Sequence, residues 1–230
     1  MDNKTIVAKA LTRGQYEALQ HPSLKIPSSN ELFEFQLETF KECELTITNE
    51  EIAKLRRFVP EEQGFFLVVP TRPRNADFTY VFRRIAKKAI NVQGHLDPRM
   101  DLLENLQDEG ELPSEPHILL RCNDGQGAIQ KNATGRASYF HNMQRTPYTF
   151  WQALVHLMVY PMLLHDFQVM AMGTIGKSDQ TKKKWSPVIQ TTTGSLQIVM
   201  RSWDDAVANC LVPSYESAVP KKEKKKSEEQ

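Results

Sequence analysis

Apolar positions along the chain follow two different spacings, and each spacing predicts its own kind of element. Apolar residues that recur every three or four positions form the buried stripe of an amphipathic helix. This spacing predicts helices at residues 12–20, 30–41, 52–58, 76–90, 98–107 and 136–143. Ser29 or Asn30 is expected to cap the second helix, and Thr48 with Glu51 has the spacing of a capping box for the third. The run FWQALVHLMVY at residues 150–160 is apolar nearly all round, so we expect a helix buried on most sides.

Short apolar runs and alternating patterns predict strands at residues 5–10, 45–47, 65–69, 117–122, 167–172, 187–193 and 195–203. Gly194 separates the last two runs, which together indicate a β-hairpin. The strands of the C-terminal third follow one another without long helices between them, so a doubly wound parallel sheet is not expected. The sequence therefore predicts an α+β fold over residues 1–212, a single compact domain with a mixed or antiparallel sheet and packed helices.

The end of the chain has a different composition. Apolar periodicity is lost from residue 213, and the last ten residues, KKEKKKSEEQ, contain five lysines and three glutamates. Such a segment has nothing to bury, so residues 213–230 are predicted to be a disordered tail. The whole chain has 29 Lys and Arg against 28 Asp and Glu, a formal net charge of +1. A charge this small gives no global attraction to nucleic acid or to an anionic membrane, and neither is expected as a partner.

The cysteines and the apolar segments bear on the compartment. Cys43, Cys122 and Cys210 are far apart and odd in number, so they indicate neither a disulfide framework nor a zinc motif. The N-terminus has no apolar stretch typical of a signal peptide, and prolines and histidines interrupt the charge-free residues 146–165. The protein is predicted to be cytoplasmic, and no metal or cofactor is predicted.

One string of residues is similar to a phosphate-binding loop. AMGTIGKS at residues 171–178 fits the loose pattern, but no apolar helix follows it, so a turn between two strands is the favoured interpretation. The alternative is an enzyme that acts on a phosphorylated or other anionic substrate through this turn. Lys177 would then contact the anion, Arg136 or Arg145 would clamp it, and His141 would be the catalytic acid or base.

Polar and aromatic side chains gather in the loops and element ends of the C-terminal half, where binding residues commonly lie. The predicted ligand-binding residues are Arg136, Tyr139, Arg145, Thr174, Lys177 and Trp185. If residues 134–145 and 173–186 meet in space, these side chains form a cationic pocket with aromatic walls. The leading hypothesis is a non-catalytic domain that binds a small anionic ligand or a protein partner there.

Four stretches carry a family resemblance: PHILL at 116–120, RTPYT at 145–149, GTIGKSD at 173–179, and Trp185. Together they resemble a bacterial, largely actinobacterial, domain family of unknown function, and they span about a third of the chain. Two departures stand out, because Thr174 replaces a serine of the family pattern and Lys177 with Ser178 intervenes before Asp179. The resemblance implies a bacterial protein and a strand-to-strand turn at residues 171–178, and it implies no activity.

The composition of the tail generates the first prediction. Deleting Lys221 to Gln230 is expected to change the free energy of unfolding by no more than about 0.5 kcal/mol, because these side chains bury nothing. Gel-shift titrations at low and moderate salt, on the full-length and the truncated chain, test the opposite case. Tight, salt-sensitive binding of nucleic acid that disappears on truncation would contradict the prediction.

Overall fold

The structure of the protein is a computed structural model. It describes residues 27–61, 65–72, 81, 84–86, 106–110, 112–125, 133–176, 184–192, 195–203, 205 and 209–217. The helices of the described part are α3 (Ser29–Glu42), α4 (Asn49–Arg56), α7 (Ala133–Asn142), α8 (Phe150–Val159) and the 3₁₀ helix η2 (Pro161–His165). The strands are β1 (Leu67–Val69), β2 (Leu106–Asp108), β3 (His117–Leu119), β4 (Arg145–Pro147), β5 (Gln168–Met170), β6 (Thr174–Gly176), β7 (Trp185–Thr192), β8 (Ser195–Ser202), β9 (Cys210–Leu211) and β10 (Ser214–Glu216).

The largest sheet is mixed and has six strands. Its order is β2-β6-β7-β5-β9, with β8 paired to β7. β5 and β9 run parallel, and the other pairs are antiparallel. The predicted hairpin is confirmed, because β7 and β8 pair over their whole length from Trp185↔Ser202 to Thr192↔Ser195. The α+β prediction with a mixed sheet is confirmed as well.

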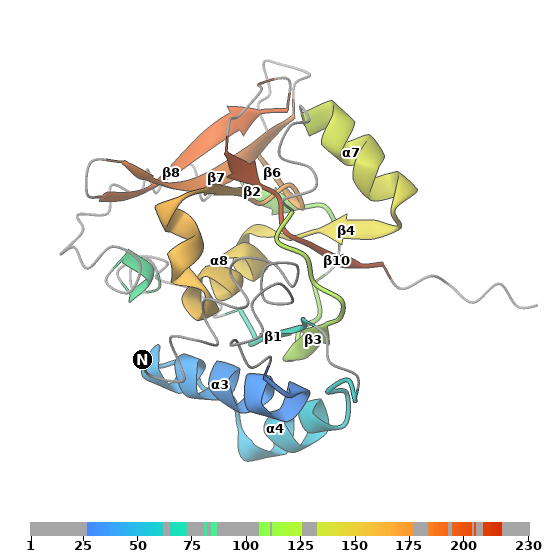
Figure 1. The fold of residues 1–230 in the computed structure, drawn as a ribbon, viewed down its shortest axis with the longest axis vertical. Helices are drawn as coiled ribbons and strands as arrows, with labels where there is room; N and C mark the ends of the chain where they lie inside the picture. The colour runs from blue at the N-terminus through green and yellow to red at the C-terminus, as the bar shows by residue number, and fades with distance from the viewer. Residues whose placement is uncertain are drawn as a thin grey trace, which may run out of the picture.

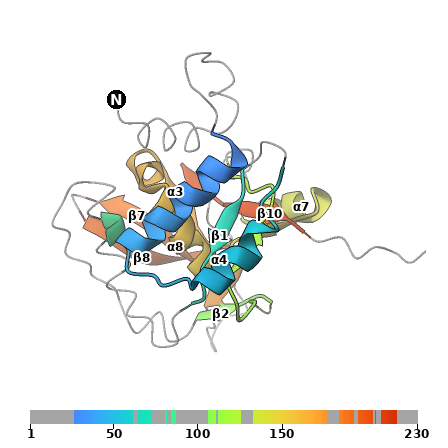
Figure 2. The same cartoon turned by 90° about the horizontal axis from the view of Figure 1, so that it is seen from below.

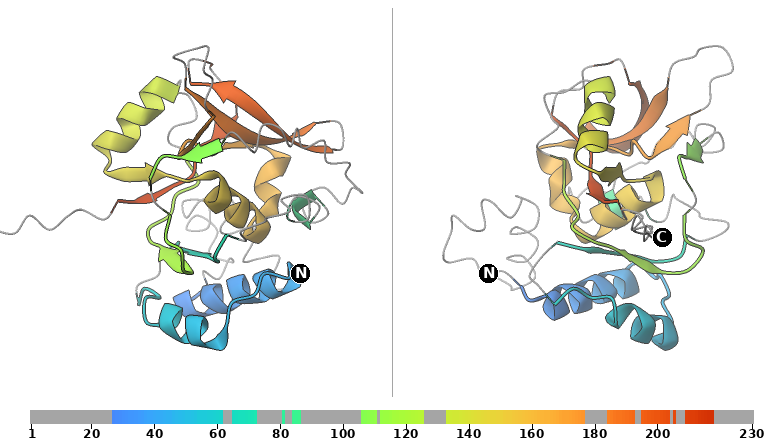
Figure 3. Two further views of the ribbon diagram at one scale, coloured as in Figure 1. Left: turned by 180° about the vertical axis from the view of Figure 1, so that it is seen from behind. Right: turned by 90° about the vertical axis from the view of Figure 1, so that its right-hand side faces the viewer.

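The two faces of this sheet carry different helices. Val169 and Ile189 lie in the main core, which includes the side chains of α8. Their neighbours Met170 and Val188 lie in a second cluster with Phe140 of α7. Successive residues of a strand point to opposite faces, so α8 covers one face and α7 packs on the other. Figure 3 shows α7 beside the sheet, at the end of the molecule away from α3 and α4.

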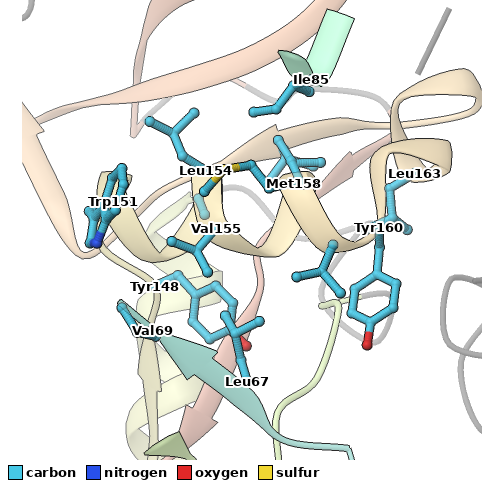
Figure 4. Close-up of a cluster of buried hydrophobic side chains, with 14 of the residues drawn as sticks. Leu67, Val69, Ile85, Tyr148, Trp151, Leu154, Val155, Met158, Tyr160 and Leu163 are labelled. Atoms are coloured by element: carbon cyan, nitrogen blue, oxygen red, sulfur yellow. The ribbon is translucent and has the colours of Figure 1, made fainter. Parts of the chain in front are cut away.

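Helix α8 is the centre of the core, and all ten of its residues are buried. Thr149 caps it through a capping box with Gln152, and the Trp151 indole donates a hydrogen bond to the Pro70 carbonyl over 2.9 Å. Figure 4 shows Leu67 and Val69 of β1 on one side of the helix and Ile85 on the other. The prediction of a helix buried on most sides is confirmed. Pro161, which ends α8, begins η2.

A second layer lies beyond α8. β1 and β3 pair in an antiparallel two-stranded sheet between α8 and the pair α3 and α4 (Figure 1). Seen from below, α3 lies across α8 (Figure 2). The capping box of α4, Thr48 with Glu51, is confirmed. Helix α3 is capped by Ser28 rather than by Ser29 or Asn30, because Ser28 completes a capping box with Glu31.

Four sequence expectations need correction. Residues 45–47, predicted as a strand, form neither a helix nor a strand. The helix predicted at 98–107 is wrong at its end, since Leu106 and Gln107 belong to β2 and pair with β6. The apolar residue Phe58 lies in a turn beyond the end of α4 rather than on a buried helical face. The tail boundary at residue 213 is also wrong, because Ser214–Glu216 pair with β4 as β10 and Ser214 is buried.

Several expectations lie outside the described residues, wholly or in part. Residues 1–26 and 218–230 are not described, so the predicted elements at 5–10 and 12–20 and the end of the tail stay predictions. Of the helix predicted at 76–90, Val81, Arg84, Ile85 and Ala86 are described and helical. Among the described residues, no helix is long and apolar enough to cross a membrane.

Candidate functional site

Arg145, one of the predicted binding residues, forms hydrogen bonds with parts of the chain that are distant in sequence. Its Nε donates to Ser214 Oγ over 2.8 Å. Its Nη2 donates to the carbonyls of Arg121 and Ser214, at 2.7 and 2.8 Å. The guanidinium therefore holds β4 against β10 and the turn after β3. An anion at this place would have to replace hydrogen bonds on which the fold depends.

Thr174 is buried and holds the beginning of α8. Its hydroxyl accepts a hydrogen bond from the Phe150 amide over 2.7 Å and donates one to Asp108 Oδ1. The Gly173 amide donates to the Tyr148 carbonyl, and the Thr174 amide donates to Ala171. These donors are already paired inside the protein, so the described part of the turn offers no amide cradle for a phosphate. Of the string at 171–178, residues 171–173 connect the strands β5 and β6, and Thr174–Gly176 form β6 itself. Lys177 lies outside the described residues.

The remaining predicted residues do not form one pocket with these two. Tyr139 packs in the second core cluster against the α7 face of the sheet, and His141 is exposed near the end of α7. Trp185 is three positions before Val188 in β7, so its side chain projects from the face opposite to α7. Arg136 lies in α7, and its side chain is outside the described part. The described residues therefore do not form the predicted cationic pocket.

The structure has a cavity of about 330 Å³ at a place that the sequence does not single out. We call it the α4–β3 groove. One wall consists of Glu51, Lys54 and Leu55 of α4 with Phe58 just beyond it, and the other consists of residues 115–118 and 120. It lies on the side of the molecule where α4 and β3 approach each other.

Large apolar side chains are exposed at this groove. Phe58 is 68% exposed and Leu120 is 45% exposed, and both line the cavity. Among the described residues, the other large hydrophobic side chain with high exposure is Met143, at 56%, in the turn after α7. Clustered exposed apolar residues beside a concavity are typical of a binding surface, whereas a single one is ordinary.

His117 gives the groove a polar group in a defined state. Its Nδ1 lies 3.1 Å from the Glu115 carbonyl, so this nitrogen carries the proton and donates. Nε2 is then an acceptor, and it is buried without a partner among the described residues. Burial lowers the pKa of His117, which keeps the ring uncharged at neutral pH.

A second group of buried polar atoms lies inside the core. The His156 ring is between Tyr148 and Tyr160, with ring centroids 5.6 and 5.3 Å away. The Tyr160 hydroxyl and both imidazole nitrogens are buried without hydrogen-bond partners among the described residues. Burial lowers the pKa of His156 to about 3, and burial raises the pKa of each tyrosine well above its ordinary value. These groups are shielded by the core, so they are less suited to contact a substrate than the α4–β3 groove.

Comparisons of the chain with protein-family models, curated proteins and solved structures give no match. The resemblance of residues 116–185 to a bacterial domain family therefore stays a prediction. Within the described ranges, no group of three or more His, Cys, Asp or Glu side chains is placed to hold a metal ion.

The sequence contains one signal for the groove, at Leu120. In HILLRC the two leucines are adjacent, so a strand there must turn one of them away from the core. Leu119 is the buried one and Leu120 is the exposed one. Phe58 gave the opposite signal, because its spacing after Leu55 matches a helical stripe although α4 ends at Arg56. Because α4 ends two residues before Phe58, this side chain is exposed and does not join the core.

The buried imidazole generates a prediction about pH. An unfolded His156 titrates near its ordinary pKa of 6.5, while the folded one titrates at about 3. Between these values the unfolded state binds more protons, so stability falls as the pH falls, by up to about 1.4 kcal/mol per pH unit. His156→Leu is expected to remove this part of the slope in urea unfolding at pH 7, 6 and 5. His141→Leu, an exposed control, is expected to keep it; equal slopes for the two variants would contradict the burial of His156.

Proposed function

We propose that the chain is a protein-interaction domain that binds an apolar segment of a partner protein in the α4–β3 groove. The observation that carries the proposal is the joint exposure of Phe58 and Leu120 on the walls of one cavity. A volume of about 330 Å³ is at the lower end of ligand sites, and it suits a few inserted side chains. Covering the two exposed side chains would remove apolar surface from water, which favours association.

The charges around the groove support an apolar partner over an anionic ligand. Glu51 and Glu115 are acidic, and Lys54 is the one basic residue among those that line the cavity. The Glu51 carboxylate accepts hydrogen bonds from the amide and hydroxyl of Thr48, at 2.8 and 2.9 Å. These bonds are the main cause that lowers the pKa of Glu51, with a smaller contribution from Lys54. The groove is therefore not a cationic site.

The proposal keeps the expected binding role and moves it from the predicted residues of the C-terminal half to α4 and β3. Arg145 and Thr174 are engaged in the internal hydrogen bonds described above, so the enzyme hypothesis finds no support in their geometry. We also place the protein in the cytoplasm. Cys43, Cys122 and Cys210 are buried as thiols, and burial raises the pKa of Cys122 to about 12, which suits a reducing compartment.

Selection of peptides on the full chain tests this function. The immobilised protein is panned against a phage library of random peptides, and the affinity of an enriched peptide is measured by fluorescence polarisation. Phe58→Asp is expected to weaken binding at least tenfold, because it places a charge in the apolar groove. Met143→Asp changes another large exposed apolar side chain, outside the groove, and it is expected to leave the affinity within about twofold.

Circular dichroism confirms beforehand that both variants are folded. Two results would overturn the proposal: a library that yields no peptide above the bare-resin background, or a peptide whose affinity is the same on Phe58→Asp and on the unsubstituted chain.

A further inference from the structure

The two-stranded sheet of β1 and β3 has one edge that is closed by a side chain. Gln36 of α3 is buried, and its Nε2 donates to the Phe66 carbonyl over 3.1 Å. Its Oε1 accepts from the Val68 amide over 2.8 Å. A primary amide has the same donor and acceptor as a peptide group, so Gln36 takes the place of a neighbouring strand along β1. At this edge, the Phe66 carbonyl and the Val68 amide therefore have hydrogen-bond partners.

The register of the β1–β3 pair shows in which direction the backbone N–H and C=O groups of β3 point. Val68 is directly opposite Ile118. Because the Val68 amide points to Gln36 and away from β3, the two residues form a pair that exchanges no backbone hydrogen bonds. The N–H and C=O of Ile118 therefore point away from β1, out of the far edge of β3. Among the described residues, none forms a backbone hydrogen bond with Ile118 there.

The same edge of β3 already receives a strand farther along the chain. Asn123 forms an antiparallel bridge with Ser214, and the Glu216 amide donates to the Leu120 carbonyl over 3.2 Å. β10 is thus hydrogen-bonded to the chain that leaves β3, and its described contacts stop at Leu120. The groove begins at that point, since its second wall is residues 115–118 and 120. Ile118 is one of the residues of this wall.

We infer that the partner segment binds as an extended strand beside β3, continuing the edge that β10 occupies as far as Leu120. Its backbone pairs with the N–H and C=O of Ile118, and its alternate apolar side chains enter the groove between Phe58 and Leu120. The exposed carboxylate of Glu115 favours a basic residue at one end of the segment. The inference rests on the proposed function and adds the conformation and composition of the partner.

The enriched peptide from the library is the probe for this inference, with the unsubstituted full chain as its receptor. Each residue of the peptide is replaced by alanine in turn, and in a second series each amide is N-methylated. A strand in the groove is expected to lose at least tenfold in affinity at every second residue of the alanine series. In the other series, the N-methyl groups that face Ile118 are expected to cost at least tenfold, and the alternate ones less than about threefold.

The amide of Ile118 reports the same contact from the protein side, and its hydrogen exchange is expected to slow at least tenfold when the peptide is bound. Losses of affinity at positions three and four residues apart in the alanine series would show that the peptide binds as a helix. That result would overturn strand addition but would leave the groove as the binding site. Unchanged exchange at Ile118 would also overturn it. A library that yields no peptide fails the proposed function itself, so the two failures are distinguishable.

Discussion

Helix α8 has no exposed face, and each layer of the protein covers a part of it. The sheet covers it through Val169 and Ile189, and β1 covers it through Leu67 and Val69 (Figure 4). Each fully buried apolar side chain contributes about 1.5–3 kcal/mol, so this helix adds substantially to the stability of the core. Burial also removes water from the first amides of the helix, and Thr149 and Thr174 supply the hydrogen bonds instead.

The need to cover α8 also explains the groove. The side of the helix away from the large sheet is covered by α3 and by the small sheet of β1 and β3, of which β1 contacts the helix. A sheet this small has two edges, and each edge carries unpaired backbone groups unless something bonds to them. Gln36 bonds to two backbone groups at the edge of β1, and β10 bonds to the chain just after β3, at Leu120 and Asn123. The edge of β3 at Ile118 lies beside Phe58 and Leu120, where the groove is.

The elements that local interactions determine could be predicted from local patterns in the sequence. The capping box of Thr48 and Glu51 is four residues long, and the apolar run of α8 carries its own evidence of burial. The hairpin of β7 and β8 needs only a short connection. The groups that hold the layers together are far apart in sequence, such as Gln36 with Val68 or Arg145 with Ser214. Composition does not tell which polar residue has such a distant partner.

The predicted binding residues Arg145 and Thr174 do not line a pocket for the same reason. Arg145 and Thr174 look like binding residues because they are polar and lie near element ends, yet the fold uses their hydrogen bonds internally. Phe58 and Leu120 look like core residues because they are apolar, yet they are exposed. Their roles depend on where α4 ends and on the direction of alternation in β3, and both are decided by packing against the rest of the chain.

The central claim is that the Val68 amide is bonded within the protein, whereas among the described residues nothing bonds to the outward amide of Ile118. Residue-resolved amide hydrogen exchange of the uncomplexed protein tests it directly, by comparing Val68 with Ile118, which face each other in the pair. The Val68 amide, bonded to buried Gln36, is expected to exchange slowly, and the Ile118 amide is expected to exchange at least about a hundredfold faster. Equal protection of the two amides would contradict the claim, because it would show that the edge of β3 is already covered in the protein alone.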